Sequence, residues 1–328
     1  MNRLYNDLTF IDLFAGIGGF RIALESYGAK CVFSSEIDKY ACKTYEANFG
    51  EMPSGDITKI PAREIPRHDI LCAGFPCQAF SISGKQLGFE DARGTLFFDI
   101  ARIADFHKPK ILFLENVKNL VYHNKGKTFS HMCDILDELG YKVFHKILNA
   151  GDFKVPQNRE RVYIVCFRKD LGVDEFVFPK PLKEYIYLID VLLPDSETHQ
   201  YVIERDDIVI TGKPDENCRP GTIRIGTINK GGQGERIYSP YGHAVTLSAY
   251  GGGAAAKTGA YLVNGRVRKL APRECCLVQG FPRDYKIPVS DSQAYKLFGN
   301  SVAIPVLKAI FKNIISLDCM KGYNVKNR

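Results

Sequence analysis

The residue with the clearest chemical potential is Cys77, within the Gly/Pro-containing segment 73–83. It follows the apolar run 69–74, which predicts a buried parallel strand, and Pro76 precedes it directly. Open α/β sheets place their chemistry beyond the carboxyl ends of their strands. We therefore predict a nucleophilic thiol at Cys77. The alternative, a small buried hydrophobe, is the better interpretation for most of the other cysteines, such as Cys31, Cys42, Cys166, Cys275 and Cys276.

Three charged residues could act with this thiol. Glu115 ends the apolar run 111–117, where desolvation should raise its pKa and let it hold a proton at neutral pH. A helix-capping or solvated acid is the alternative. Arg159 and Arg161 alternate and therefore share one face of an extended segment, where two guanidiniums could clamp a carboxylate, a phosphate or a carbonyl. Ordinary surface arginines are the alternative for this pair.

A cofactor pocket is indicated by the glycine-rich segment 14–19, between an expected strand and an expected helix. Glycines let a backbone approach a ligand closely, and a helix N-terminus favours polar or anionic groups. The acid Glu36 ends the next strand, about 20 residues further on, where a ribose hydroxyl is usually bound. Asp56 is a further strand-end acid. Because the glycine spacing departs from the dinucleotide pattern, an adenosine without a pyrophosphate fits better than NAD.

The elements that must position these residues alternate between apolar strand patterns and amphipathic helical patterns. Such alternation predicts βαβ units and an α/β fold with a doubly wound, mostly parallel, Rossmann-like sheet. Strands are expected at 9–14, 30–35, 70–73, 110–115 and 161–167, and helices at 20–27, 39–49, 96–106 and 129–139.

The pattern changes after about residue 179. Short β-like pieces at 200–203, 222–225 and 244–247 lie among glycine-rich turns, and helical patterns return at 272–279, 292–298 and 304–315. We predict a smaller, loop-rich β domain over 189–271, a hinge over 272–299, and a catalytic and cofactor-binding domain made of 1–188 plus 300–328. Residues 219–268 hold seven basic residues against the single acid Glu235, which makes a phosphate-facing surface plausible, although charge alone slightly favours an ordinary solvated loop region.

Composition narrows the protein class. The chain has 328 residues, 45% of them hydrophobic and 25% charged, with a net charge of +7. No apolar run is long enough to cross a membrane, and the first residues lack a signal-peptide pattern, so we expect a cytoplasmic protein with no membrane partner. The ten cysteines include no C-x-x-C pair, so no metal site is expected.

Taken together, the motifs resemble those of the DNA (cytosine-5) methyltransferases over essentially the whole chain, and most closely those of a type II modification methylase. The resemblance is carried by DLFAGIGGF (12–20), Glu36, GDI (55–57), GFPCQAFS (74–81), ENV (115–117), QNRER (157–161), RECCLVQGFP (273–282) and GNSV (299–302). One position departs: an aromatic is expected over the adenine, but this chain has Ile37 and no tryptophan. We therefore expect weaker cofactor binding.

The resemblance implies a reaction. Cys77 would add to C6 of cytosine while Glu115 donates a proton toward N3, and Arg161 with Arg159 would hold the ring carbonyl. The activated C5 would take the methyl group of S-adenosylmethionine, leaving S-adenosylhomocysteine, and the base must be flipped out of the duplex. The implied cofactor site is Phe14, Gly16, Ile17, Gly19, Glu36, Ile37, Asp56, Ile57, Pro76, Leu96, Asn300, Ser301 and Val302.

The implied partner is double-stranded DNA, bound by a monomer with no obligate protein partner. Residues 78–95 would form a lid, and residues 230–250 would read the target, with Arg236 as the guanine reader. The resemblance suggests the site 5′-GCGC-3′, methylated at the inner cytosine, as in a type II restriction-modification system. The expected DNA contacts are Ser83, Lys85, Arg93, Gln233, Glu235, Arg236, Ser248, Tyr250 and Gly253.

Two other functions stay open at this point: a tRNA cytosine-5 methyltransferase, because one branch of the family acts on RNA, and a catalytically inactive DNA-binding relative. The long glycine-rich region with its basic half favours duplex DNA, and the full set of expected catalytic residues disfavours an inactive relative. A nicotinamide oxidoreductase is disfavoured by the glycine spacing.

Overall fold

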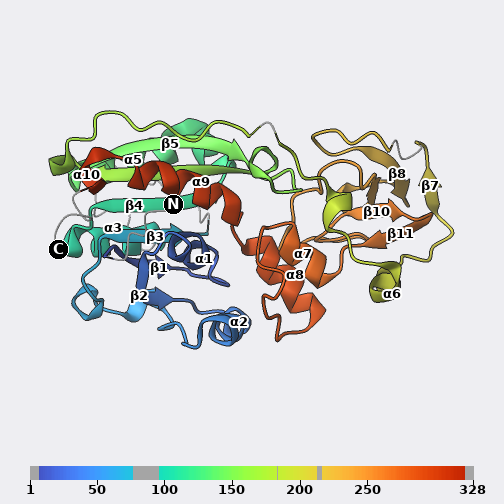
Figure 1. Cartoon of the computed structure of the whole chain (residues 1–328), viewed down its shortest axis with the longest axis horizontal. Coiled ribbons are helices and arrows are strands. Elements are labelled where there is room, and N and C mark those ends of the chain that lie inside the picture. The colour runs from blue at the N-terminus through green and yellow to red at the C-terminus, as the bar shows by residue number, and fades with distance from the viewer. Residues whose placement is uncertain (1–6, 77–95, 183, 213–215, 322–328) are drawn as a thin grey trace.

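A computed structural model of the chain describes residues 7–76, 96–182, 184–212 and 216–321. Within these residues the larger sheet has the strand order β2-β1-β3-β4-β6-β5 (Figure 1). Strands β2, β1, β3 and β4 are parallel, whereas β6 and β5 are antiparallel to their neighbours. The strands are β1 (Thr9–Leu13), β2 (Lys30–Ser35), β3 (Ile70–Gly74), β4 (Ile111–Val117), β5 (Tyr141–Asn149) and β6 (Glu160–Arg168).

The doubly wound α/β fold is therefore confirmed, and the five strands expected from the sequence lie within a few residues of their predicted bounds. Strand β5 was not predicted. It borders the sheet and pairs only with β6, so its side chains do not follow the continuous apolar pattern of the central strands.

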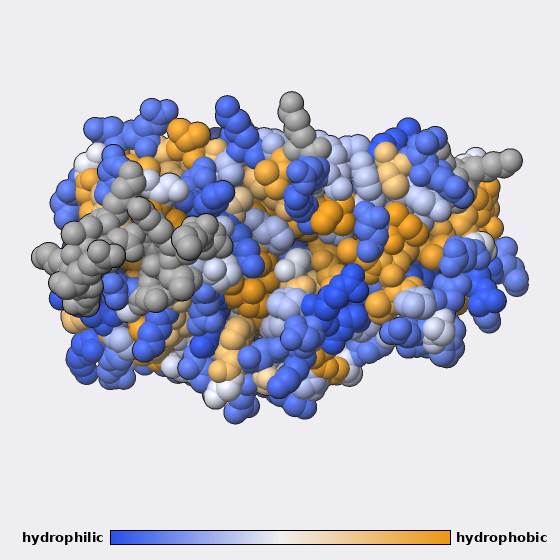
Figure 2. Space-filling view, viewed as in Figure 1, coloured by the Kyte–Doolittle hydropathy of each residue, from blue (hydrophilic) through white to orange (hydrophobic). Residues whose placement is uncertain are grey.

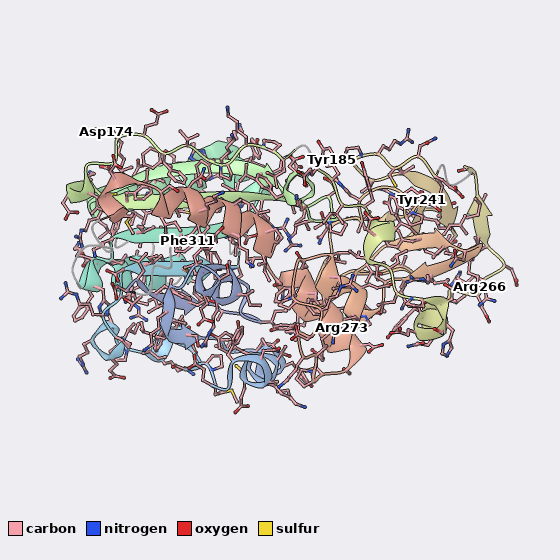
Figure 3. All side chains as sticks on the ribbon, in the orientation of Figure 1. Asp174, Tyr185, Tyr241, Arg266, Arg273 and Phe311 are labelled. Carbon is pink, nitrogen blue, oxygen red and sulfur yellow. The ribbon has the colours of Figure 1, made fainter. Side chains whose placement is uncertain are left out.

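Helices cover both faces of this sheet, as the amphipathic patterns require. One face buries apolar residues of α1 and α9, and the opposite face buries those of α3 and α5. Figure 3 marks Phe311 of α9, which is fully buried and meets Tyr27 edge-on at 5.7 Å between ring centroids. The helices of this part are α1 (Gly19–Glu25), α2 (Lys39–Phe49), α3 (Leu96–His107), α4 (Asn119–Tyr122), α5 (Lys127–Glu138), α9 (Ile304–Ile315) and α10 (Asp318–Lys321).

A second sheet with the order β11-β10-β9-β8-β7 lies at the other end of the molecule (Figure 1). Its strands are β7 (Ile208–Ile210), β8 (Arg224–Ile228), β9 (Arg236–Tyr238), β10 (Ala260–Val263) and β11 (Arg266–Lys269), and the short helix α6 (Asp195–Thr198) precedes them. All of these elements fall inside the range predicted for the smaller domain.

Two of the predicted β-like pieces form isolated bridges instead of strands. Residues 200–203 begin with the end of a 3-10 helix, His199–Tyr201, and Val202 then forms a single antiparallel bridge with Arg268 of β11. Residues 244–247 join no sheet, because Ala244 forms an isolated bridge with Gln157 of the larger part. The apolar residues of this segment are buried by that contact, which explains why they looked like a strand.

Helices α7 (Pro272–Leu277) and α8 (Asp291–Asn300) lie between the two sheets (Figure 1). A bidentate ion pair joins the last strand to α7: the guanidinium of Arg268 donates to both carboxylate oxygens of Glu274 at 2.7 and 2.8 Å, and both side chains are buried. The span Asp291–Ile315 is long and apolar enough to cross a membrane, but 67% of its 18-residue apolar window is buried inside the protein, as in a core helix.

The outer edge of the second sheet exposes hydrophobic residues, which gather at that end of the face shown in Figure 2. The edge strand β7 contributes Val209, 52% exposed, and Ile210, 41% exposed. An edge strand of three residues offers little length for pairing with another chain.

Candidate active site

The carboxyl ends of the parallel strands β1, β2, β3 and β4 open into a cavity of about 640 Å³. Each strand end contributes to its wall. Phe14 follows β1, Glu36 follows β2, Phe75 follows β3, and Glu115 lies near the end of β4. Because these strands run side by side in one direction, the residues that follow them meet at one edge of the sheet. The sequence motifs are thus brought together by topology.

One side of this cavity is the glycine-rich turn before α1. Gly16 and Gly18 both have positive φ, of 55° and 80°, which favours glycine. The carboxylate of Glu36 closes the turn, because its Oε2 accepts a hydrogen bond from Gly16 N at 2.8 Å and its Oε1 accepts from the amides of Ile37 and Asp38. A carboxylate has about four acceptor sites, so capacity remains for a ligand hydroxyl.

The loop that precedes α9 lies against this turn. A Cβ added at Gly19 would come within 2.4 Å of Val302 Cγ2, so the turn and the loop are in close contact. A smaller cavity of about 80 Å³ lies between them and shares Phe14, Gly16, Glu36 and Asn300 with the larger one. All thirteen residues predicted to bind the cofactor line one or both of these cavities.

Ile37 is 73% exposed and lines the larger cavity. Asp56, which also lines that cavity, has a carboxylate that accepts hydrogen bonds from Thr58 N and Oγ1 at 3.1 and 2.7 Å. The bonds from Thr58 lower the pKa of Asp56, so this acid is ionised at neutral pH.

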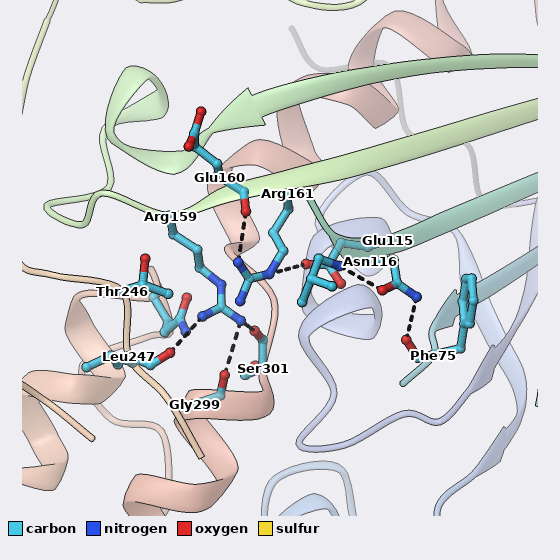
Figure 4. A network of polar contacts seen from close by, with 12 residues as sticks. Phe75, Glu115, Asn116, Arg159, Glu160, Arg161, Thr246, Leu247, Gly299 and Ser301 are labelled. Carbon is cyan, nitrogen blue, oxygen red and sulfur yellow. Dashed lines mark hydrogen bonds and ion pairs between the residues drawn. The ribbon is translucent and has the colours of Figure 1, made fainter. Parts of the chain in front are cut away.

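Glu115 is the buried acid of the cavity, 7% exposed (Figure 4). Its Oε1 lies 3.3 Å from Arg161 Nε. Burial raises the pKa of Glu115, and the positive charges of Arg161 and Arg159 oppose part of that rise. The arrangement is a carboxyl that can hold or release a proton beside a fixed cation.

Asn116, the residue after Glu115, holds the end of β3. Its Nδ2 donates to the carbonyl of Phe75 at 2.8 Å, and its Oδ1 accepts from Val117 N (Figure 4). Phe75 is followed by Pro76, whose side lines the cavity, and then by Cys77. The buried amide of Asn116 therefore fixes the main chain at Phe75, two residues before Cys77 in the sequence.

The two arginines at the start of β6 have different contacts: Arg159 directly precedes the strand, and Arg161 is its second residue. Arg161 Nη1 donates to the carbonyl of Glu160 at 2.8 Å, and its side chain lines the cavity beside Glu115. Arg159 is 2% exposed, and its guanidinium donates to the carbonyls of Leu247, Gly299 and Ser301 at 3.1, 3.2 and 2.5 Å (Figure 4). Its part in the reaction stays a prediction. The hydrogen bonds in the structure connect Arg159 to the loop at Leu247 and to the segment 299–301.

A second cavity of about 390 Å³ lies beside the smaller sheet. It is lined by four of the residues predicted to contact DNA: Gln233, Arg236, Ser248 and Tyr250. Tyr250, 75% exposed, also lines the large cavity, so the two spaces are adjacent.

The two remaining predictions in this region have local roles in the structure. The carboxylate of Glu235 accepts hydrogen bonds from Asn229 Nδ2 and Gly232 N at 3.0 and 3.1 Å, which closes its own turn. Gly253 has φ of 100°, and an added Cβ would lie 2.7 Å from the carbonyl oxygen of Gly234. A side chain at position 253 would therefore clash with the main chain at Gly234, so the contact between these two loop segments requires glycine at position 253.

Comparison with known proteins agrees with this geometry. The model of the family described as C-5 cytosine-specific DNA methylase matches residues 8–316. The chain belongs to this family. Type II methyltransferase M.HhaI of Haemophilus parahaemolyticus is 60% identical over 316 residues, which cover 96% of this chain and 97% of that protein. Type II methyltransferase M.HpaII of Haemophilus parainfluenzae is 46% identical over 333 residues, 95% of this chain and 90% of that protein.

Solved structures share the fold. S. pombe Dnmt2 methyltransferase superposes with a TM-score of 0.72 at 19% identity, covering 94% of this chain and 98% of that one. A mutant of Spodoptera frugiperda DNMT2 gives 0.71, also at 19% identity, with 94% and 100% coverage. As a C-5 cytosine-specific DNA methylase, the chain is a methyltransferase that acts on DNA.

Four of the predicted site residues, Cys77, Ser83, Lys85 and Arg93, lie outside the described residues, as does the lid predicted over 78–95. Their roles stay predictions.

Sequence reasoning missed three residues that build the site. Gln157 is fully buried, and its amide bonds Val278 O and Leu247 N, which ties the two parts of the molecule together. Gly299 packs on the main chain of Ser248 and Ala249, 2.3 Å from where its Cβ would be. Tyr163 is buried beside Glu115. Each had a signal in the sequence: Gln157 and Gly299 stand in the motifs QNRER and GNSV, and Tyr163 continues the alternation of Arg159 and Arg161.

Proposed function

We propose that this DNA methylase transfers a methyl group to C5 of a cytosine flipped out of duplex DNA, at the inner cytosine of 5′-GCGC-3′, as the modification enzyme of a type II restriction-modification system. The observation that supports this best is the buried carboxyl of Glu115, 3.3 Å from Arg161, in the cavity that also holds Glu36. One cavity thus contains both an acid that can protonate a pyrimidine ring, Glu115, and a carboxylate that can accept hydrogen bonds from a ribose, Glu36.

The proposed chemistry begins with the thiolate of Cys77, which forms a bond to C6 of the cytosine. Glu115 gives its proton to N3, so the electron pair displaced from the C5–C6 double bond is available at C5. Arg161 holds the ring carbonyl. After C5 is methylated, a water molecule takes the C5 proton, and the electron pair of that C–H bond re-forms the C5–C6 double bond as the Sγ–C6 bond breaks and the thiolate leaves. The N3 proton returns to Glu115. Arg159 acts in this scheme as a positioning residue through its three main-chain bonds.

The cofactor side fits S-adenosylmethionine. Glu36 has free acceptor capacity for ribose hydroxyls, the glycine-rich turn permits close approach, and Ile37 offers an apolar surface for the adenine. When bound, S-adenosylmethionine supplies an electrophilic methyl group on a sulfonium. Ile37 covers less of the adenine ring than an aromatic side chain would, so we propose that the cofactor binds more weakly than it would with an aromatic at this position.

For the DNA side, we propose residues 189–271 as the target-recognition domain, 272–299 as the hinge, and 1–188 plus 300–328 as the catalytic and cofactor-binding domain. The support is the cavity that Gln233, Arg236 and Ser248 share with Tyr250, adjacent to the reaction cavity. Arg236 matches guanine, since a guanidinium can donate to both O6 and N7.

The test is bisulfite sequencing of DNA from cells that express this chain. We expect conversion-resistant cytosines at the inner position of GCGC sites and nowhere else. Resistance at another sequence would reject the site but keep the reaction. No resistance, together with methyl transfer to tRNA in vitro, would favour the RNA-directed alternative.

Cys77→Ser tests the nucleophile in the same system. Its turnover should be lost while its binding to a GCGC duplex persists, and a duplex carrying 5-fluorocytosine should be trapped covalently by the wild type only. Normal methylation by this variant would reject the proposed chemistry.

A further inference from the structure

The glycine-rich turn 14–19 has a backbone conformation that needs support from outside the turn. Phe14, Gly16 and Gly18 have φ of 55°, 55° and 80°, so every second residue is left-handed. The left-handed region is unfavourable for a residue with a side chain, and Phe14 has a large one. Such a turn keeps its shape only where the surrounding structure fixes it.

Two side chains bond this turn at neighbouring residues. One is Glu36, whose carboxylate accepts from Gly16 N at 2.8 Å. The other is Tyr285, whose hydroxyl donates to the carbonyl oxygen of Ile17 at 2.5 Å in a buried contact. Ile17 lines the smaller of the two cavities, whereas Tyr285 belongs to the lining of neither. A residue 268 positions away in the sequence therefore supports the cavity wall from outside the cavity.

Tyr285 is itself held in place by its neighbours. It is buried, and its ring meets that of Phe281 at 4.8 Å between centroids. Its carbonyl accepts a hydrogen bond of 2.6 Å from Nη1 of Arg273, which is labelled in Figure 3. The next residue, Lys286, exchanges main-chain hydrogen bonds of 2.8 and 3.0 Å with the side chain of Asn48 on α2. Ring packing and these bonds together fix the position of the phenol.

The segment that carries Tyr285 also bonds the opposite wall of the smaller cavity. Gln279 is fully buried, its Nε2 donates to the carbonyl of Phe298 at 2.8 Å, and its own carbonyl accepts from Ile304 N at 3.1 Å. These contacts flank the loop 299–302, which lines the smaller cavity together with the glycine-rich turn. Residues 279–285 therefore connect the two walls of the proposed cofactor site.

We propose that Tyr285 is a positioning residue for the cofactor: its hydroxyl holds the glycine-rich turn, through the carbonyl of Ile17, in the conformation to which S-adenosylmethionine binds. Phenylalanine would fill the same buried space but could not donate this bond. Burial raises the pKa of Tyr285, so its hydroxyl keeps its proton at neutral pH and remains a donor. This inference rests on the binding of S-adenosylmethionine in this cavity, proposed above.

Loss of the bond should affect cofactor binding and leave the chemical step unchanged. Without it, the turn is in its binding conformation for a smaller fraction of the time, and the apparent dissociation constant rises by the inverse of that fraction. One hydrogen bond changes an equilibrium by a factor of about five. Bound cofactor selects the binding conformation again, so the methylation rate at saturating cofactor should not change.

The test is Tyr285→Phe, with Tyr295→Phe as the matched control. Tyr295 lies on α8 and is also buried, but its hydroxyl donates at 2.8 Å to the carbonyl of Leu270, which lines neither cavity. Each variant thus loses one bond from a phenol to a main-chain carbonyl, and their denaturation midpoints should fall by similar amounts. Binding of S-adenosylhomocysteine is measured by calorimetry, and amide hydrogen exchange of residues 12–24 by mass spectrometry, both without DNA.

In Tyr285→Phe, the dissociation constant for S-adenosylhomocysteine should rise about fivefold, and the amides of the turn should exchange faster. In Tyr295→Phe, both should keep their wild-type values. In steady-state methylation of a GCGC duplex by Tyr285→Phe, KM for S-adenosylmethionine should rise by a similar factor while kcat stays unchanged. A role in stability alone would lower both midpoints without separating the two variants in cofactor binding.

The inference is overturned if Tyr285→Phe binds S-adenosylhomocysteine as tightly as the wild type, or if Tyr295→Phe weakens that binding to the same extent. Either result, with a wild type that binds the ligand, would reject the role of Tyr285 alone. A wild type that does not bind S-adenosylhomocysteine would instead reject the proposed cofactor, and this inference with it. The two proposals can thus fail separately.

Discussion

Arg159→Lys is the substitution whose effect can be worked out best from the structure. The arginine donates three hydrogen bonds to main-chain carbonyls from a position that is 2% exposed. Lysine keeps the charge but has a single compact ammonium in place of a planar fork, so it can serve about one of the three carbonyls. Hydrogen bonds to charged groups contribute about 1.5–3 kcal/mol each. Losing two of them should lower the free energy of unfolding by about 3 kcal/mol.

The assay is thermal denaturation, in which that loss corresponds to a fall of about 6 °C in the midpoint, at roughly 2 °C per kcal/mol for a long chain. Arg161→Lys, two residues further along the chain, is the matched control. Its side chain is less buried and bonds one carbonyl, so its midpoint should change little, whereas its methylation rate should fall about 100-fold through the loss of a donor at the reacting ring. The reasoning is wrong if Arg159→Lys has the same denaturation midpoint as the wild type, or if Arg161→Lys has the lower midpoint of the two variants.

Three further outcomes are expected. Ile37→Trp should tighten S-adenosylhomocysteine binding about fivefold by calorimetry, because it adds roughly 50 Å² of apolar contact; an unchanged dissociation constant would contradict this. Gly299→Ala should weaken binding to a GCGC duplex and lower the free energy of unfolding by about 2 kcal/mol, because its Cβ would meet the main chain of Ser248 at 2.3 Å; wild-type values for both would show that the loops yield freely. Glu274→Gln should lower the free energy of unfolding by about 3 kcal/mol in urea, since it leaves the buried Arg268 without its counter-charge; a smaller loss than for a surface Glu→Gln would refute this.

The first half of the fold could be predicted from the sequence because the central strands are buried on both faces. Ile70–Gly74 and Ile111–Val117 read as continuous apolar runs, and the helices between them carry one apolar face each. Such periodicity depends only on burial, which the sequence records. The edge strand Tyr141–Asn149 alternates partly exposed residues, so it left no comparable signal.

The second half could not be predicted in the same way, because its segments are held by contacts that are distant in sequence. Residues 244–247 bond Gln157 and Arg159, about 88 residues away, instead of a neighbouring strand. Glycines such as Gly253 and Gly299 are required by the main chain that they touch, and that contact exists only once the chain has folded. Periodicity carries no information about either.

The site itself was recognisable because several of its motifs follow parallel strands, and strand order then brings them together. The motifs did not reveal that Arg159 and Arg161 make different contacts. Both Arg159 and Arg161 line the large cavity, but their contacts differ: Arg161 lies beside Glu115, whereas Arg159 is more deeply buried and donates to three main-chain carbonyls. Spacing alone cannot distinguish two such environments.

The way in which the loop 244–250 is attached bears on how target recognition and chemistry are combined. Asn158 N bonds Ala244 O, the Gln157 amide bonds Leu247 N, and Arg159 bonds Leu247 O, so these three attachments use main-chain atoms of the loop. Main-chain atoms are the same whatever side chains the loop carries. Side chains beyond the attachment, such as Tyr250, can therefore differ without releasing the loop from the catalytic part, whereas a change at Gln157 or Arg159 would loosen it for any target sequence.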